Sequence, residues 1–327
     1  MSVSKRPRST TPPTSPPTTK RTRKLTPVRF LILSDTHSTP LPHPLPACDV
    51  LLHCGDLTST GTPHSLTHAL QDLGRTTAEL KLVIPGNHEL ALDKAYYLSQ
   101  GGNPTAVKQA QALVSAAPES EASRNGITFL HEQGTRKFTL ASGTSFTLYS
   151  SPYTPAFGAS AFQYPSVEDR FNPASECLPW ATSVGTAASI IPGGVDVVMT
   201  HGPAKYVLDG VERGGIAGCV HLRRAVARVR PALFCFGHVH AGYGAQRLSF
   251  LTEKSRRDGD AEEDGIVPLP REWVGRNQAR RKGFACLPPG SVEAFRRGGQ
   301  TLAVNAALEG SEEGVLENVP WVVELEL

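Results

Sequence analysis

The sequence has few of the features that mark secreted, membrane-spanning or fibrous proteins. Its six cysteines are widely spaced and form no Cys-x-x-Cys pair, which argues against a disulfide scaffold and predicts buried free thiols in a reducing compartment. No run approaches the about 18 apolar residues of a membrane-spanning helix, and the N-terminus lacks the apolar centre of a signal peptide. We therefore expect a soluble protein of the cytoplasm, the nucleus or both, without a membrane partner.

A large excess of one charge is also missing, because 33 Lys and Arg face 30 Asp and Glu in 327 residues. The first 27 residues are the exception: they carry seven Lys or Arg, six Pro and eleven Ser or Thr but no acidic residue. This composition predicts a disordered basic tail over residues 1–27. Because the remaining chain is slightly acidic, nucleic acid is not an expected partner.

Two basic clusters, at residues 5–8 and 20–24, lie within this tail. Their spacing is typical of a two-part nuclear import signal, so the import machinery is an expected partner of residues 5–24. A solvated basic tail that carries no such signal is the alternative.

The rest of the chain, residues 28–327, predicts a single α/β domain. Short apolar runs of strand length alternate with helical patterns, the strands expected at residues 28–33, 49–54, 80–84, 195–199 and 232–236 and the helices at 65–75, 105–116 and 219–229. Residues 127–150 break this rhythm and predict antiparallel hairpins, and residues 321–325 predict a last strand. The mixed-charge stretch at about 252–300 indicates a surface insertion, partly disordered.

Five short polar clusters stand just past the ends of the five apolar strands. Loops at the carboxyl edge of strands in layered α/β folds converge on one crevice, so these residues are expected to meet. Gly-Asp is common enough to occur by chance and recurs at Gly259-Asp260, whereas Gly-Asn-His and Gly-His-x-His are rare in a chain of this composition. The clusters are Asp35-Thr36-His37, Gly55-Asp56, Gly86-Asn87-His88-Glu89, Thr200-His201-Gly202 and Gly237-His238-Val239-His240.

Imidazole, carboxylate and carboxamide donors without a thiolate suit Mn, Fe, Zn or Ni rather than a structural zinc site. The donors are too many for one open catalytic ion. Seven of them, one a shared carboxylate, fit two divalent ions about 3.5–4 Å apart, a separation typical of phosphatases and nucleases.

The order Asp-x-His, Gly-Asp, Gly-Asn-His-Glu, His and Gly-His-x-His resembles the calcineurin-like metallophosphoesterase superfamily. Within this superfamily, two segments are similar to the metallophosphoesterase-domain-containing subgroup, which is related to class III cyclic-nucleotide phosphodiesterases. These segments are Leu33-Ser34-Asp35-Thr36-His37 and Thr200-His201-Gly202-Pro203. The resemblance implies a two-sheet β-sandwich flanked by helices, with a dimetal site at the carboxyl edge of the strands.

The resemblance also implies a role for each matching residue. Asp35, His37 and His240 would bind the first ion (Mn, Fe or Zn), and the second would be bound by Asn87, His201 and His238. Asp56 would bridge the two ions, and a hydroxide shared by the ions would attack phosphorus. His88 would protonate the leaving group, and Glu89 is interpreted as capping or orienting the following helix rather than binding metal.

The donor residues therefore predict a hydrolase of phosphodiesters, and the resemblance implies 3′,5′-cyclic nucleotides or other small phosphodiesters as candidate substrates. The alternatives are a nucleotide-binding scaffold with weak turnover and a protein or small-molecule phosphomonoesterase. The Asp-Arg-Gly of protein phosphatases is missing after Gly55-Asp56. Tyr153 belongs to an aromatic loop that could stack a nucleobase, or whose aromatic rings could serve only to hold the loop itself in place. The remaining histidines, including His64 and His68, are interpreted as packing or surface residues.

Overall fold

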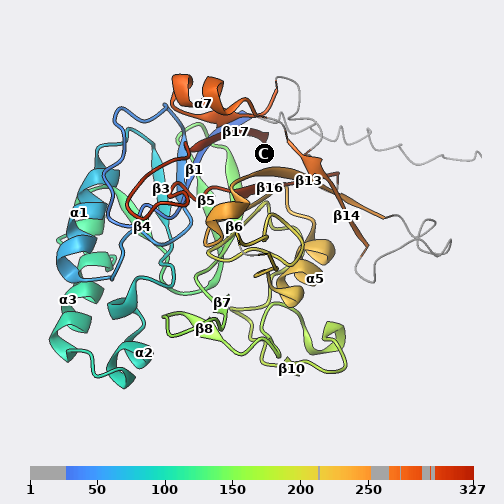
Figure 1. Cartoon of the computed structure of the whole chain (residues 1–327), viewed down its shortest axis with the longest axis horizontal. Helices are drawn as coiled ribbons and strands as arrows, with labels where there is room; N and C mark the ends of the chain where they lie inside the picture. The colour runs from blue at the N-terminus through green and yellow to red at the C-terminus, as the bar shows by residue number, and fades with distance from the viewer. Residues whose placement is uncertain (1–26, 213, 252–264, 273, 289–294, 296–298) are drawn as a thin grey trace, which may run out of the picture.

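The computed structural model describes residues 27–212, 214–251, 265–272, 274–288, 295 and 299–327. Two large sheets organise this part of the chain (Figure 1). The six-stranded sheet runs in the order β15 (Ala285–Cys286), β17 (Trp321–Glu326), β1 (Pro27–Leu33), β2 (Val50–His53), β3 (Leu80–Val83) and β4 (Ile127–Phe129). The seven-stranded sheet runs in the order β14 (Ile266–Arg271), β13 (Gly244–Phe250), β16 (Thr301–Asn305), β12 (Leu233–Phe236), β11 (Val197–Thr200), β6 (Ser145–Ser151) and β5 (Gly134–Thr139).

Both sheets are buried on two faces, which explains why their central strands are apolar without interruption. Phe30 and Ile32 of β1 point into the space between the sheets, where Phe30 meets Phe146 of β6 edge to face at 5.6 Å. Leu31 and Leu33 point the other way, into a second cluster beneath the helices. The two sheets thus form a sandwich around one shared core.

Helices cover the outer faces of the sandwich. Leu70 of α1 (Pro63–Gly74) and Val114 of α3 (Pro104–Val114) pack beside the six-stranded sheet, while Leu222 and Val226 of α5 (Val220–Val229) pack on the seven-stranded sheet. Figure 1 shows α1 and α3 on the side away from α5. The shorter elements are α2 (Lys94–Ser99), α4 (Glu121–Arg124), α7 (Arg276–Lys282), the paired strands β7 (Thr154–Pro155) and β8 (Gln163–Tyr164), and β9 (Glu168–Asp169) with β10 (Thr182–Ser183).

This architecture confirms the predicted α/β sandwich with helices on both sides. The expected last strand is β17, which pairs antiparallel with β1. One prediction is wrong: residues 127–129 form β4, a strand parallel to β3, and only β5 and β6 make a hairpin. The alternating residues of this short segment are typical of a hairpin strand, but the strand that β4 pairs with, β3, is distant in sequence.

Several expectations concern residues that the structure describes only in part. Residues 1–26 of the expected tail and 252–264 of the expected insertion lie outside the described residues, whereas Pro27 begins β1. The described part of 252–300 supplies β14 and β15, one edge strand to each sheet. Among the described helices, no apolar stretch reaches the length that a membrane crossing needs. All six cysteines are free thiols, and three of them, Cys54, Cys219 and Cys235, are buried.

Candidate metal centre

The polar clusters do meet, at the carboxyl edges of both sheets. In the six-stranded sheet, Asp35 follows β1, Asp56 follows β2, and Asn87 and His88 follow β3. The seven-stranded sheet contributes from the other side, with His201 after β11 and the loop His238 to His240 after β12. Parallel strands bring these ends to one place, as the sequence predicts.

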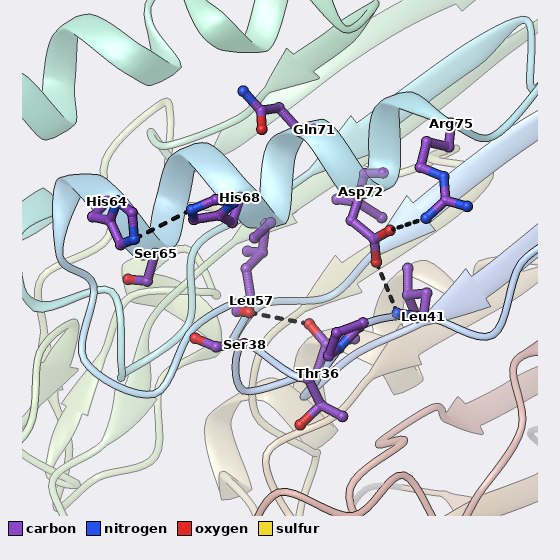
Figure 2. A pocket seen from close by; sticks show the side chains of 14 residues that line it. Thr36, Ser38, Leu41, Leu57, His64, Ser65, His68, Gln71, Asp72 and Arg75 are labelled. Atoms are coloured by element: carbon purple, nitrogen blue, oxygen red, sulfur yellow. Dashed lines mark hydrogen bonds and ion pairs between the residues drawn. The ribbon is translucent and has the colours of Figure 1, made fainter.

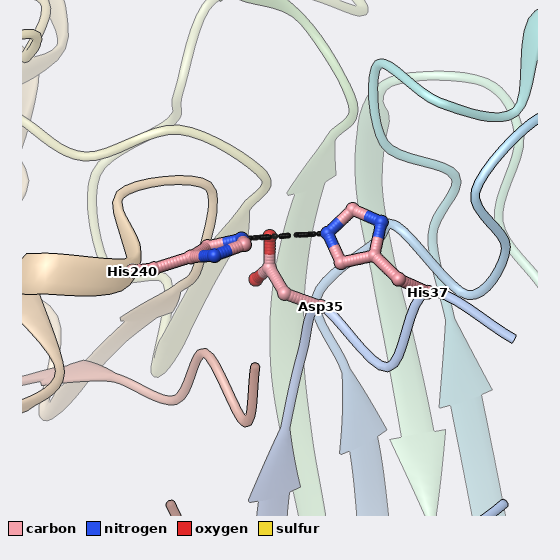
Figure 3. A group of neighbouring side chains, drawn as sticks. All are labelled: Asp35, His37 and His240. Carbon is pink, nitrogen blue, oxygen red and sulfur yellow. Dashed lines mark hydrogen bonds and ion pairs between the residues drawn. The ribbon is translucent and has the colours of Figure 1, made fainter. Parts of the chain in front are cut away.

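The first group of donors contains Asp35, His37 and His240 (Figure 3). The Nε2 atoms of His37 and His240 lie 3.3 Å apart, and His240 Nε2 is 3.4 Å from Asp35 Oδ1. His240 Nδ1 donates to the carbonyl oxygen of Gly310 at 3.3 Å, so Nε2 is the ring nitrogen that faces Asp35. The ligand atoms of Asp35, His37 and His240 thus lie close enough together to bind one cation, which would displace a proton from His240.

The second group contains Asp56, His201 and His238, with Asn87 beside them. His201 Nδ1 donates to the carbonyl oxygen of Cys54 at 2.9 Å, which leaves Nε2 directed at the centre. That nitrogen lies 2.8 Å from Asn87 Oδ1 and 3.3 Å from Asp56 Oδ2. The Asn87 amide is oriented by its Nδ2, which donates to Ser160 Oγ at 2.8 Å.

Asp56 connects the two groups. Its Oδ2 lies 3.3 Å from His201 Nε2 and 3.9 Å from His37 Nε2, so one oxygen reaches a histidine of each group. Its Oδ1 accepts the backbone N–H of His88 at 2.8 Å, which holds the carboxylate in this orientation. A carboxylate placed in this way is suited to bridge two cations.

The carboxylates and imidazoles of the centre shift the pKa values of one another against the effect of burial. Burial alone would raise the pKa of Asp35 and Asp56, but the neighbouring histidines outweigh it and hold both values below the usual range. Burial would likewise lower the pKa of His201 and His240, yet the carboxylates raise each to about 9. A divalent cation can take the place of the imidazole protons beside the ionised carboxylates, so this set of oxygen and nitrogen donors fits divalent ions such as Mn, Fe or Zn.

His88 lies beside both groups, and with His37 and Asp56 it makes a third set of donors whose ligand atoms lie within 4.8 Å of one another. Its Nδ1 donates to the carbonyl oxygen of Ser59 at 2.8 Å, and its ring meets that of His37 edge to face at 4.8 Å between centroids. The side chain is half-buried. Its Nε2 is therefore the ring nitrogen available to a metal ion or to a substrate.

Several supporting contacts could not be predicted from the motifs. Glu89 is buried, and its carboxylate accepts the backbone N–H groups of Thr58 at 2.9 Å and Gly86 at 2.7 Å, which joins the loops after β2 and β3. The interpretation of Glu89 as a helix cap is wrong, because the short helix that follows has no side-chain cap. Asn305, at the end of β16, donates to the Val239 carbonyl at 2.8 Å.

Tyr153 lies outside the two donor groups. The Arg170 guanidinium lies 4.2 Å from the centre of its ring, and Phe162 approaches edge to face at 5.8 Å. The predicted contact between Tyr153 and a substrate stays a prediction.

Known proteins share this pattern of residues. The sequence model described as calcineurin-like phosphoesterase matches residues 28–242, about two thirds of the chain. The chain belongs to this family. Its members are phosphoesterases that use divalent metal ions. The matched range contains the six residues of the two donor groups and also Asn87.

Relatives place the chain near the metallophosphoesterase-domain-containing proteins. It is 32% identical over 233 residues to human metallophosphoesterase domain-containing protein 1, covering 66% of this chain and 61% of that protein. A UPF0046 protein of Caenorhabditis elegans is 32% identical over 229 residues, covering 66% of this chain and 52% of the relative. A probable rhamnogalacturonate lyase C of Emericella nidulans is 34% identical over 221 residues, which cover 67% of this chain but 18% of that protein. The chain thus spans less than two thirds of these relatives.

Proposed function

We propose that the chain is a dimetal phosphodiesterase that hydrolyses small phosphodiesters, with 3′,5′-cyclic nucleotides as the preferred class. The observation that carries the proposal is the pair of donor groups that share Asp56, because this arrangement suits two adjacent cations. Asp35, His37 and His240 bind one ion, whereas Asn87, His201 and His238 bind the other.

When bound, two such ions neutralise phosphate charge and make a coordinated water acidic near neutral pH. The protein supplies the remaining functions. Asp56 fixes the spacing of the two binding groups, and the backbone carbonyls of Cys54 and Gly310 keep Nε2 of His201 and His240 directed at the centre. His88 protonates the departing oxygen through Nε2 while its Nδ1 stays on Ser59.

A substrate panel tests the proposal. The purified chain, loaded with Mn²⁺, is assayed with cyclic AMP, cyclic GMP, bis-nitrophenyl phosphate and nitrophenyl phosphate, and the Asp56→Asn variant serves as the control for contaminating hydrolases. We expect both classes of diester to turn over at least about tenfold faster than the monoester. Faster monoester hydrolysis would identify a phosphomonoesterase, and nucleotide binding without turnover would identify a scaffold.

We also propose that residues 5–24 direct the protein to the nucleus as well as the cytoplasm. The support is the pair of basic clusters in this stretch. Replacing both clusters with Ala should abolish nuclear enrichment, and an unchanged distribution would contradict the proposal.

A further inference from the structure

A cavity of about 520 Å³ lies beside helix α1, with Thr36 and Ser38, the neighbours of His37 in the chain, on its opposite wall (Figure 2). Two histidines of α1, His64 and His68, line it one helical turn apart, and both side chains are exposed. His64 lies in the first turn of α1, directly after Pro63.

The two imidazoles are arranged as a pair of donors. Their Nε2 atoms lie 3.2 Å apart and share a hydrogen bond, which a bound ion would replace, and their rings meet edge to face at 4.4 Å between centroids. Two nitrogens bound to one tetrahedral ion at about 2.0–2.1 Å are about 3.3 Å apart. The same separation, 3.3 Å, occurs between His37 and His240 in the metal centre described above. The geometry at α1 therefore matches that of a chelating pair.

We propose that His64 and His68 form an additional site for a zinc-class divalent ion, separate from the two donor groups at the strand ends. Imidazole pairs favour Zn²⁺, Ni²⁺ and Cu²⁺ over Mg²⁺ and Mn²⁺. Residues four apart on a helix face the same side, so both rings can bind one ion without any change in the backbone.

The surroundings limit this site to two protein ligands. Asp72, one turn beyond His68, already accepts the Leu41 N–H at 2.8 Å and pairs with His43 at 2.9 Å and Arg75 at 3.2 Å. Water in the cavity therefore completes the coordination. The partial positive charge of the helix N-terminus also opposes a cation here. We thus expect an exchangeable ion, bound more weakly than the ions of the main centre.

Zinc binding to the metal-loaded protein tests the proposal. Equilibrium dialysis against increasing free Zn²⁺, followed by elemental analysis, should show one weaker zinc per chain beyond the ions of the main centre. His64→Ala and His68→Ala should each weaken this additional binding at least about tenfold. His131→Ala, which removes an exposed histidine elsewhere, should leave it unchanged.

The variants keep the experiment decisive. Because both side chains are exposed, each variant should retain the helical circular dichroism signal and the wild-type rate of phosphodiester hydrolysis with saturating Mn²⁺. A zinc isotherm of either variant that superposes on that of the wild type would overturn the additional site. That result would leave the main centre untouched, because none of its proposed ligands is changed.

Discussion

Asp56 lies in a sharp backbone turn after β2, and its carboxylate reaches both donor groups from there. Its φ angle is 51°, and Asp35, His37 and His238 also have positive φ angles, of 53°, 43° and 66°. Non-glycine residues rarely adopt this conformation, which costs of order 1–3 kcal/mol each. Four strained residues in one centre indicate that the surrounding fold holds these side chains in place, as precise ligand positions require.

Replacing Asp56 tests its bridging role. The Asp56→Asn substitution preserves shape but removes one negative charge between two dications, so at least one ion per chain should be lost and turnover should fall at least about 100-fold. Elemental analysis and an assay with a cyclic nucleotide measure both effects. Asp49→Asn is the matched control, because Asp49 lies next to the other end of β2, where its carboxylate accepts the Arg29 N–H at 2.8 Å. Retention of two ions and full activity by Asp56→Asn would refute the bridge.

His88 should matter most when the leaving oxygen is a poor anion. His88→Ala should slow the hydrolysis of cyclic nucleotides by about 10²–10⁴-fold, the usual contribution of positioned proton transfer, with metal content unchanged. A nitrophenyl diester should lose much less, because its leaving group is already stable as an anion. Rates for both substrates with the same preparations provide the comparison. Equal losses would assign His88 to phosphate binding instead.

At the scale of helices and strands, a residue at the end of β16 holds the loop after β12 in place through hydrogen bonds. The Nδ2 atom of Asn305 bonds to the carbonyl oxygens of Val239, at 2.8 Å, and Leu208, at 3.3 Å. Asn305 Oδ1 accepts the Ala307 N–H at 3.2 Å. Val239 separates His238 from His240, so Asn305 positions two proposed ligands although it lies outside residues 28–242 of the family match.

Replacing Asn305 should weaken metal binding more than it slows hydrolysis at saturating metal. Asn305→Ala leaves buried backbone groups unpaired, so we expect a loss of about 1–3 kcal/mol in unfolding free energy. The Mn²⁺ concentration for half-maximal activity should rise about 10–100-fold, whereas the rate at saturating Mn²⁺ should stay near that of the wild type. Asn318→Ala, which removes a bond to the Ala307 carbonyl, is the control. An unchanged Mn²⁺ requirement in Asn305→Ala would exclude the positioning role.

A second polar network ties α5 to the segment that follows β9. Asp169 is buried and accepts the backbone N–H groups of Phe171 and Asn172, both at 3.1 Å, and it lies 3.4 Å from His221 Nδ1. Burial raises the pKa of Asp169, but His221 and Asn172 outweigh this effect and hold it below the usual value.

Because the pKa of Asp169 is lower in the folded state, its ionisation stabilises the protein fully above the unfolded value of 3.8. This contribution is lost as the pH falls below that value. Asp169→Ala should cost at least about 2 kcal/mol at neutral pH, and urea titrations should show this difference shrinking at low pH. A difference independent of pH would contradict the network's dependence on charge.

At the scale of the whole molecule, the sequence predicted what depends on local pattern. Apolar runs followed by polar clusters located β1, β2, β3, β11 and β12 and the meeting of their carboxyl ends. The strand β16 and its Asn305 were not predicted, since the alanine-containing run 301–308 has no distinctive periodicity. Carbonyl groups such as those of Cys54 and Gly310 cannot be identified from side-chain types, because any residue supplies one.

The basic N-terminal stretch should be dispensable for catalysis. The described residues contain all the proposed ligands, and β1 begins at Pro27 with its pairing to Glu326. Deletion of residues 1–26 should therefore leave the rate of phosphodiester hydrolysis within about twofold. The deletion variant and the full chain are compared at equal metal content. A much slower deletion variant would show that the stretch contributes to the active protein.

The most direct test of the dimetal phosphodiesterase combines metal analysis with activity on one preparation. The full chain is stripped with a chelator, dialysed, and titrated with Mn²⁺ while cyclic-nucleotide hydrolysis and bound metal are measured together. The two donor groups that share Asp56 predict negligible activity in the stripped protein and full recovery when two ions are bound per chain. Full activity in the stripped protein, or recovery complete with a single ion, would contradict the account.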